Sequence, residues 1–209
     1  MIPRLPSLAL LLAAALTLSG CAGLFGGGPA LDAFELRAPS EGPVARRSLG
    51  RDLVVELPEA GPAVDIDRIL VRPNPLQAQY LPRARWTAPA PVMLQTLMVR
   101  RFEDANAFRF VGRRPLGPGG DFALIGELTD FQAELNDTGP GALVRVRLTA
   151  RLVREEDAAV MASRSFQITE PAESLETLEL LGAFNTATDR LLTELSGWVL
   201  TRLGAAPTG

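Results

Sequence analysis

Apolar and polar residues alternate most regularly between residues 143 and 154. Val144 and Val146 fall on one side of an extended chain there, whereas Arg145 and Arg147 fall on the other. Successive side chains of a strand point to opposite faces, so this alternation is typical of a strand with one buried face. We expect a long strand over these residues, with its arginine side chains on the exposed face.

Two more β-rich segments, residues 122–135 and 160–169, flank this strand along the chain. Within the first segment the apolar positions change parity near Thr129 and Asp130, and a β-bulge there would bring both halves to the same face. Short turn-forming intervals separate the three segments. Together they predict an antiparallel meander with one buried face.

The apolar positions take the three- and four-residue spacing of a helix in two places. Residues 90–105 carry one apolar face, and Pro91 suits the first turn of a helix. Residues 175–203 carry a longer stripe, which consists of Leu180, Phe184, Ala187, Leu191, Leu195 and Trp198. Both segments are therefore expected to be amphipathic helices that cover a sheet.

Shorter strand candidates lie at residues 33–37, 53–57, 66–72 and 108–111, and a proline-punctuated stretch runs from residue 73 to residue 91. The predicted fold class is α+β: a mostly antiparallel sheet with a long three-stranded meander, one face of which is covered by the two amphipathic helices. Parallel pairing of the early strands stays open, because the first helix could serve as a crossover connection.

The first twenty residues have the composition of a bacterial signal peptide. Arg4 precedes an apolar run of about eleven residues, which is too short to span a bilayer as a helix. The residues Leu18-Ser19-Gly20-Cys21 then fit the lipobox that lipoprotein-processing enzymes read. We predict cleavage between Gly20 and Cys21 and attachment of lipid to the Cys21 thiol. The alternatives are an ordinary secretory signal with a chance cysteine, or an N-terminal anchor.

The predicted lipoprotein has four parts, which are a signal peptide at 1–20, acylated Cys21 with a glycine-rich tether at 21–30, a domain at 31–203 and a tail at 204–209. The several acyl chains of a lipoprotein, at about 0.8 kcal/mol per buried methylene, would hold it on a membrane. Ala22 follows Cys21, where an aspartate would favour retention in the inner membrane. We therefore expect the periplasmic face of the outer membrane rather than the inner membrane.

The composition of the chain argues against nucleic-acid binding, histidine-based chemistry and a disulfide framework. The formal net charge is −3, so no basic excess attracts nucleic acid. The chain contains no histidine, which removes the commonest general base near neutral pH and the commonest zinc ligand. The single cysteine rules out an internal disulfide.

Carboxylates are the remaining candidates for chemistry. The densest groups are Asp65 with Asp67, beside a strand, and residues 155–157, in a turn. Solvated structure explains both positions better than catalysis does. We therefore expect no catalytic residue, no metal site and no cofactor.

The arginine face of residues 143–154, which consists of Arg145, Arg147 and Arg151, has two interpretations. It could meet lipid headgroups or an acidic partner. We favour the other interpretation, in which these arginines pair with Asp130, Gln132 and Glu134 on the neighbouring strand.

Several stretches, taken in order, resemble the ABC-type transport auxiliary lipoproteins, which are the lipoprotein components of mammalian-cell-entry (MCE) type lipid transport systems. The matching residues are 67–72, Pro75, Leu76, Tyr80, Arg85, Trp86, Pro89, Pro91 and 124–131, with Gln132 and Glu134 following. The lipobox and the final helix agree as well, so the resemblance covers residues 31–203. Gln79 departs from the pattern, since many members carry a second aromatic residue before the tyrosine.

The resemblance implies a non-enzymatic protein at the outer-membrane end of a transport system. Its partners would be an MCE-domain protein with an ABC permease and an ATPase, and its cargo a phospholipid or another hydrophobic compound. Whether the chain forms a homo-oligomer stays open. The alternative functions are a lipoprotein scaffold of another envelope assembly machine and a carboxylate-dependent envelope hydrolase.

Residues 80–86 are the candidate contact with that partner. Tyr80, Arg85 and Trp86 are residue types that anchor protein interfaces, and the neighbouring prolines would pre-order the segment. The equally weighted alternative is that Trp86 seals the core.

Overall fold

The computed structural model describes residues 30–37, 41–117, 120–136, 139–205 and 207–208. Residues 32–209 form one compact unit, which carries the helices and strands described below. The predicted signal peptide, Cys21 and nearly all of the predicted tether lie outside the described residues.

Three long strands form the meander that the alternation pattern predicts, and they are β8 (Phe122–Leu135), β9 (Ala142–Arg154) and β10 (Ala159–Ala172). Both neighbouring pairs are antiparallel. The pairing of β8 with β9 shifts register between Leu128 and Asp130, which confirms the predicted bulge. Because of this shift Leu128 and Phe131 are both buried, although they differ in parity.

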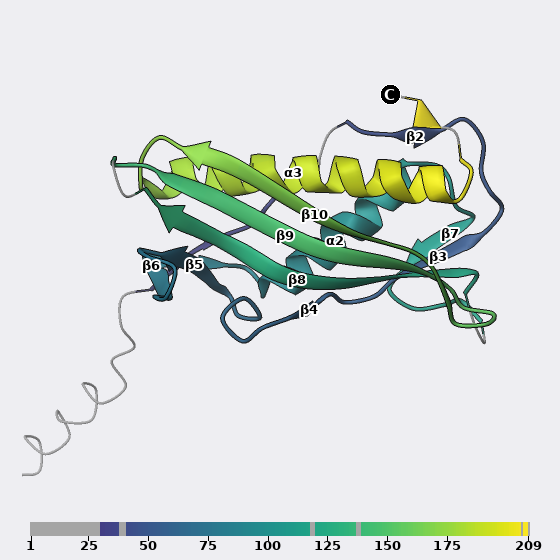
Figure 1. Ribbon diagram of the computed structural model, residues 1–209, viewed down its shortest axis with the longest axis horizontal. Coiled ribbons are helices and arrows are strands. Elements are labelled where there is room, and N and C mark those ends of the chain that lie inside the picture. The colour runs from purple at the N-terminus through teal and green to yellow at the C-terminus, as the bar shows by residue number, and fades with distance from the viewer. Residues whose placement is uncertain (1–29, 38–40, 118–119, 137–138, 206, 209) are drawn as a thin grey trace, which may run out of the picture. The chain divides into compact units, whose positions relative to one another are not determined.

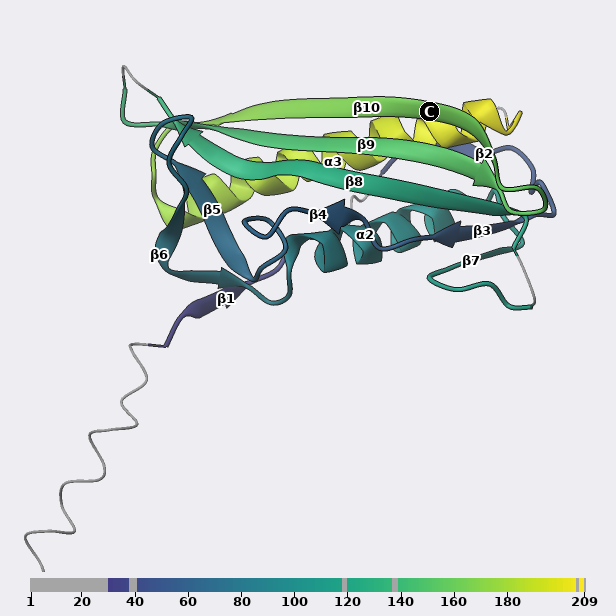
Figure 2. The same ribbon diagram turned by 60° about the horizontal axis from the view of Figure 1, so that its bottom comes forward.

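On its other side β8 pairs in parallel with three short strands, which are β3 (Asp52–Val55), β4 (Glu59–Ala60) and β5 (Arg68–Arg72). The nine-stranded sheet is completed by β7 (Phe110–Gly112) beside β3 and β6 (Gln79–Trp86) beside β5 (Figure 1), and by β1 (Asp32–Phe34) beside β6 (Figure 2). A separate two-stranded sheet joins β2 (Val44–Ala45) to β11 (Pro207–Thr208).

The α+β class is confirmed, and the meander is antiparallel as predicted. The early strands, however, pair in parallel with the meander, so the sheet is mixed. The strands β3, β4 and β5 all run parallel to β8, which is the option that the sequence left open. The strand β6 lies in the proline-punctuated stretch and was not predicted. Pro82 falls where the pairing of β6 with β5 is irregular, so its missing N–H breaks no ladder bond.

Two helices, α2 (Ala90–Asp104) and α3 (Thr177–Arg202), lie on one face of the sheet (Figure 2). This confirms the two predicted helices, and Pro91 occupies the first turn of α2 as expected. The predicted apolar stripe of α3 is buried from Leu180 through Trp198. It packs on β9 and β10, so the main core lies between the meander and α3.

Candidate functional site

Trp86 belongs to the core and not to an exposed contact surface. Its side chain is 1% exposed. Its ring centroid lies 5.9 Å from that of Phe131 on β8 and 5.4 Å from that of Phe184 on α3. This packing supports the interpretation that Trp86 seals the core. The prediction that Trp86 offers an exposed contact is wrong. The reason is the pleat of β6, which turns Trp86 inward.

Arg85 and Tyr80 lie in different surroundings, although the sequence grouped them. The Arg85 guanidinium pairs with the Asp67 carboxylate at 3.3 Å and also donates to the carbonyl of Trp86 at 3.2 Å. Tyr80 is half-buried, and the Arg68 guanidinium carbon lies 5.5 Å from its ring centroid. Arg83 between them has a φ of 60°, a conformation that bends β6. The predicted contact segment is therefore divided, and its role in partner binding stays a prediction for Tyr80 and Arg85.

Tyr80 lines an apolar groove of about 310 Å³ at one end of the molecule. We call it the end groove, and its lining residues are Val71, Gln79, Tyr80, Leu81, Pro82, Leu135, Leu175 and Leu180. They come from β5, β6, the last residue of β8, the segment before α3 and the first turn of α3. The sequence did not predict this groove, because its walls are far apart along the chain.

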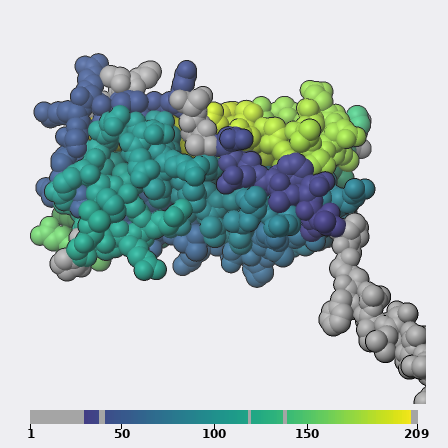
Figure 3. All heavy atoms as spheres, turned by 180° about the vertical axis from the view of Figure 1, so that it is seen from behind, coloured from purple at the N-terminus to yellow at the C-terminus, as the bar shows by residue number. Residues whose placement is uncertain are grey.

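Exposed leucines lie on the same segments of the chain that supply the walls of the end groove. Leu175 is 43% exposed, Leu178 on the first turn of α3 is 75% exposed, and Leu76 in the turn between β5 and β6 is 97% exposed. In Figure 3 the purple start of the described chain lies near the blue-green residues of β6 and the yellow-green start of α3, all at the right-hand end. This end of the molecule is therefore rich in exposed apolar surface.

A polar groove of about 590 Å³ adjoins the end groove through Leu135, which lines both. Gln132 lies at its base, with 4% of its surface exposed. Its amide accepts a bond from Arg72 Nε at 2.6 Å and donates to Glu134 Oε1 at 2.8 Å. The buried amide is therefore satisfied by neighbouring side chains.

Two of the three arginines on the polar face of β9 are paired as we expected, whereas Arg151 lies opposite Ile125 of β8 and forms no ion pair among the described residues. Arg145 donates two hydrogen bonds to Glu134, at 2.9 and 2.7 Å, and Arg147 pairs with Asp130 at 3.0 Å. The Arg145 hydrogen bonds are the main cause that lowers the pKa of Glu134, and the same pair raises the pKa of Arg145. Arg145 and Arg147 are thus held in ion pairs with carboxylates of β8 and are not free positive charges.

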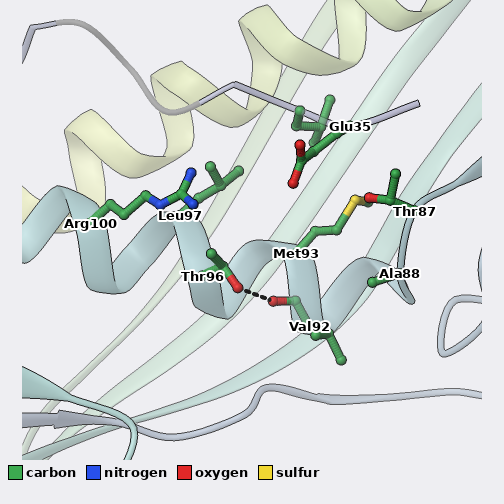
Figure 4. A pocket seen from close by; sticks show the side chains of 9 residues that line it. Glu35, Thr87, Ala88, Val92, Met93, Thr96, Leu97 and Arg100 are labelled. Carbon is green, nitrogen blue, oxygen red and sulfur yellow. Dashed lines mark hydrogen bonds between the residues drawn. The ribbon is translucent and has the colours of Figure 1, made fainter. Parts of the chain in front are cut away.

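A smaller pocket, of about 70 Å³, lies beside α2. Glu35 from the segment after β1 lines it together with Met93, Thr96 and Arg100 of α2, as Figure 4 shows. Thr96 Oγ1 donates to the Val92 carbonyl at 3.0 Å. The volume is enough for a few water molecules and not for a lipid chain.

Two of the acidic residues noted in the sequence form ion pairs with arginine side chains. Asp67 pairs with Arg85, and Asp157 pairs with Arg154 at 3.5 Å in the turn between β9 and β10. Among the described residues, no group of three or more histidine, cysteine, aspartate or glutamate side chains is placed so that it could hold a metal ion. The same part of the chain has no helix that is both long and apolar enough to cross a bilayer.

The chain matches one known protein family over most of its length. The model of the ABC-type transport auxiliary lipoprotein component family matches residues 34–196. An uncharacterised protein of Bradyrhizobium diazoefficiens, bll6063, is 28% identical over 180 residues, which is 84% of this chain and 47% of the relative. The chain therefore spans about half the length of that relative.

Solved structures share the fold. The crystal structure of protein XCC0632 from Xanthomonas campestris is similar with a TM-score of 0.75 and 29% identity, and the match covers 82% of this chain and 96% of that one. A second crystal structure, of an uncharacterised protein, gives a TM-score of 0.64 with 12% identity, over 82% of this chain and 99% of that one. At such low identity, the second likeness concerns the fold alone.

Proposed function

Because the chain belongs to the family of ABC-type transport auxiliary lipoprotein components, we propose that it is the non-enzymatic lipoprotein of an MCE-type lipid transport system. In this role it binds an MCE-domain protein that works with an ABC permease and an ATPase. The cargo is a phospholipid or another hydrophobic compound. The observation that carries the proposal is the family match, which spans the sheet from the last residue of β1 onward and most of α3.

The lipobox supports the membrane part of this proposal. Cleavage before Cys21 and acylation of its thiol would anchor the domain by several acyl chains. We place the anchor at the periplasmic face of the outer membrane, because no aspartate follows Cys21. The domain then works as a tethered binding module.

The exposed part of residues 80–86 supports a site for the MCE partner. Arg85 and Asp67 form an ion pair whose side chains are 37% and 40% exposed, so a partner can reach both. Arginine is enriched at the centres of protein interfaces. We therefore propose that the Arg85–Asp67 pair, rather than Trp86, faces the partner.

Co-isolation from the native envelope tests the proposal. The tagged lipoprotein is cross-linked in cells and purified, and its partners are identified by mass spectrometry against an untagged strain. We expect the MCE-domain protein, the permease and the ATPase to be enriched together. Enrichment of components of a different envelope machine, with the transport proteins at background level, would contradict the proposal.

A further inference from the structure

The apolar end of the molecule is also the end at which the chain leaves toward the predicted anchor. The strand β1 pairs with β6, with Asp32 opposite Ala84, and β6 supplies one wall of the end groove. The segment after β1 is also bound to α3, because the Arg37 amide donates to Asn185 Oδ1 at 2.8 Å. The point where the tether joins the domain is therefore fixed close to the end groove.

Chain length keeps this end near the bilayer. Only ten residues separate Cys21 from Asp32, and ten residues reach at most about 35 Å. The strand β8 alone has 14 residues, which is roughly 45 Å. The groove end, where β8 finishes at Leu135, can thus touch the membrane, whereas the other end of the meander can do so only if the domain lies flat.

The exposed leucines at this end have the chemistry of a membrane contact. Leu175, which lines the end groove, is 43% exposed, and Leu178 in the first turn of α3 is 75% exposed. Leu76 is 97% exposed in the turn that joins β5 to β6. Leucine side chains gain free energy when they enter the boundary between lipid headgroups and acyl chains. Since the anchor has already brought the domain to the surface, a small apolar contact is enough to orient it.

We propose that this leucine end, consisting of Leu76, Leu175, Leu178 and the end groove, rests on the bilayer that holds the acyl chains of Cys21. The proposal relies on the acylation proposed above. Glu173, Glu176 and Glu179 lie beside the leucines and are exposed. The contact is therefore driven by apolar burial and not by attraction to anionic lipid.

A pair of single-thiol variants tests this orientation. Acylation consumes Cys21, the only cysteine of the chain, so a new cysteine is the only free thiol of the lipidated protein. Leu178→Cys places that thiol at the leucine end. The matched control is Leu116→Cys, because Leu116 is 72% exposed in the loop that leads into β8 at the other end. Each variant is labelled with an environment-sensitive fluorophore and reconstituted into phosphatidylcholine vesicles.

The proposal predicts that the probe at residue 178 shifts to shorter emission wavelength and is quenched severalfold more strongly by nitroxide-labelled acyl chains than the probe at residue 116. Adding phosphatidylglycerol to the vesicles should leave this ratio unchanged. Leu175→Cys should repeat the result, and a matching melting temperature shows that each variant is folded.

Three outcomes overturn the proposal in distinguishable ways. If the labelled proteins float with the vesicles but both probes are quenched equally, the leucine end does not rest on the bilayer, and the anchor stands. If neither protein floats and mass spectrometry finds no acyl chain, the anchor itself is wrong. Shielding of residue 178 only after the MCE-domain protein is added would assign the end groove to that protein instead.

Discussion

Trp86 of β6 meets Phe184 of α3 edge to face, with their ring centroids 5.4 Å apart and their planes at 83°. Phe131 of β8 lies against both rings, so this aromatic contact joins the sheet, the edge strand β6 and the long helix. Such pairs contribute about 0.5–1.5 kcal/mol beyond the burial of their area. The segment that the sequence offered as a contact surface thus supports the fold from within.

Replacement of Trp86 by alanine should destabilise the domain strongly. Removing a buried aromatic side chain costs about 3–5 kcal/mol, from the lost burial and the cavity that remains. The matched change Arg85→Ala removes only an exposed ion pair, and its cost should stay at or below about 1 kcal/mol. Urea denaturation followed by circular dichroism measures both, and equal effects would show that Trp86 is not a core residue in solution.

A charge in the stripe of α3 should be far more harmful than the same charge outside it. Leu191→Asp puts a carboxylate at a position that is 0% exposed, and an unpaired buried charge costs several kcal/mol, comparable to the stability of a small domain. Leu178→Asp, at the exposed start of the same helix, should change stability by less than about 0.5 kcal/mol. Similar melting temperatures for the two variants would refute the packing of this helix on the sheet.

Acid should weaken the ion pair on the outer face of the meander. The Arg145 hydrogen bonds hold the pKa of Glu134 below its ordinary value of 4.5 in the folded state. The pair therefore stabilises the fold above about pH 4.5 and loses this contribution as the pH falls through the folded-state pKa.

Glu134→Gln isolates this contribution. The variant should be less stable than the wild type by roughly 1 kcal/mol at pH 7, because the pair is partly exposed. The difference should shrink as the pH is lowered below 4.5. Glu127→Gln, an exposed position on the same strand, is the control. A stability difference that is the same at pH 7 and pH 3 would mean that charge on Glu134 is not its source.

The anchor prediction has a direct genetic test. Cys21→Ser removes the thiol that would accept lipid, so we expect uncleaved precursor and no acylated product. Fractionation of the envelope and mass spectrometry of the N-terminal peptide report both. A variant that still fractionates as a mature outer-membrane lipoprotein would rule out the lipobox interpretation.

The elements with a regular local pattern were predictable from the sequence. The alternation over β9, the parity change at Thr129 in β8 and the helical stripe of α3 each depend on neighbours a few residues apart. The strand β6 has no such pattern, since Pro82 interrupts it and Arg83 bends it. The pairing of β2 with β11 joins residues at opposite ends of the described chain, which no local pattern reveals.

The candidate site was predictable only in part, for a related reason. Tyr80 and Trp86 are neighbours in sequence, but Tyr80 lines the end groove whereas Trp86 is buried in the core. Leu135 and Leu175 come from other elements, so the groove exists only after folding. One signal was available: Leu178 lies off the apolar stripe by which its helix packs on the sheet, and its side chain is exposed.

Binding between purified proteins tests the central claim, that this chain is the lipoprotein partner of an MCE-type system. The mature protein, with its fold verified by its melting transition, is titrated with the periplasmic domain of the MCE-domain protein from the same organism. We predict saturable binding that Arg85→Ala weakens severalfold without loss of stability. No binding by the folded wild-type protein would contradict the account.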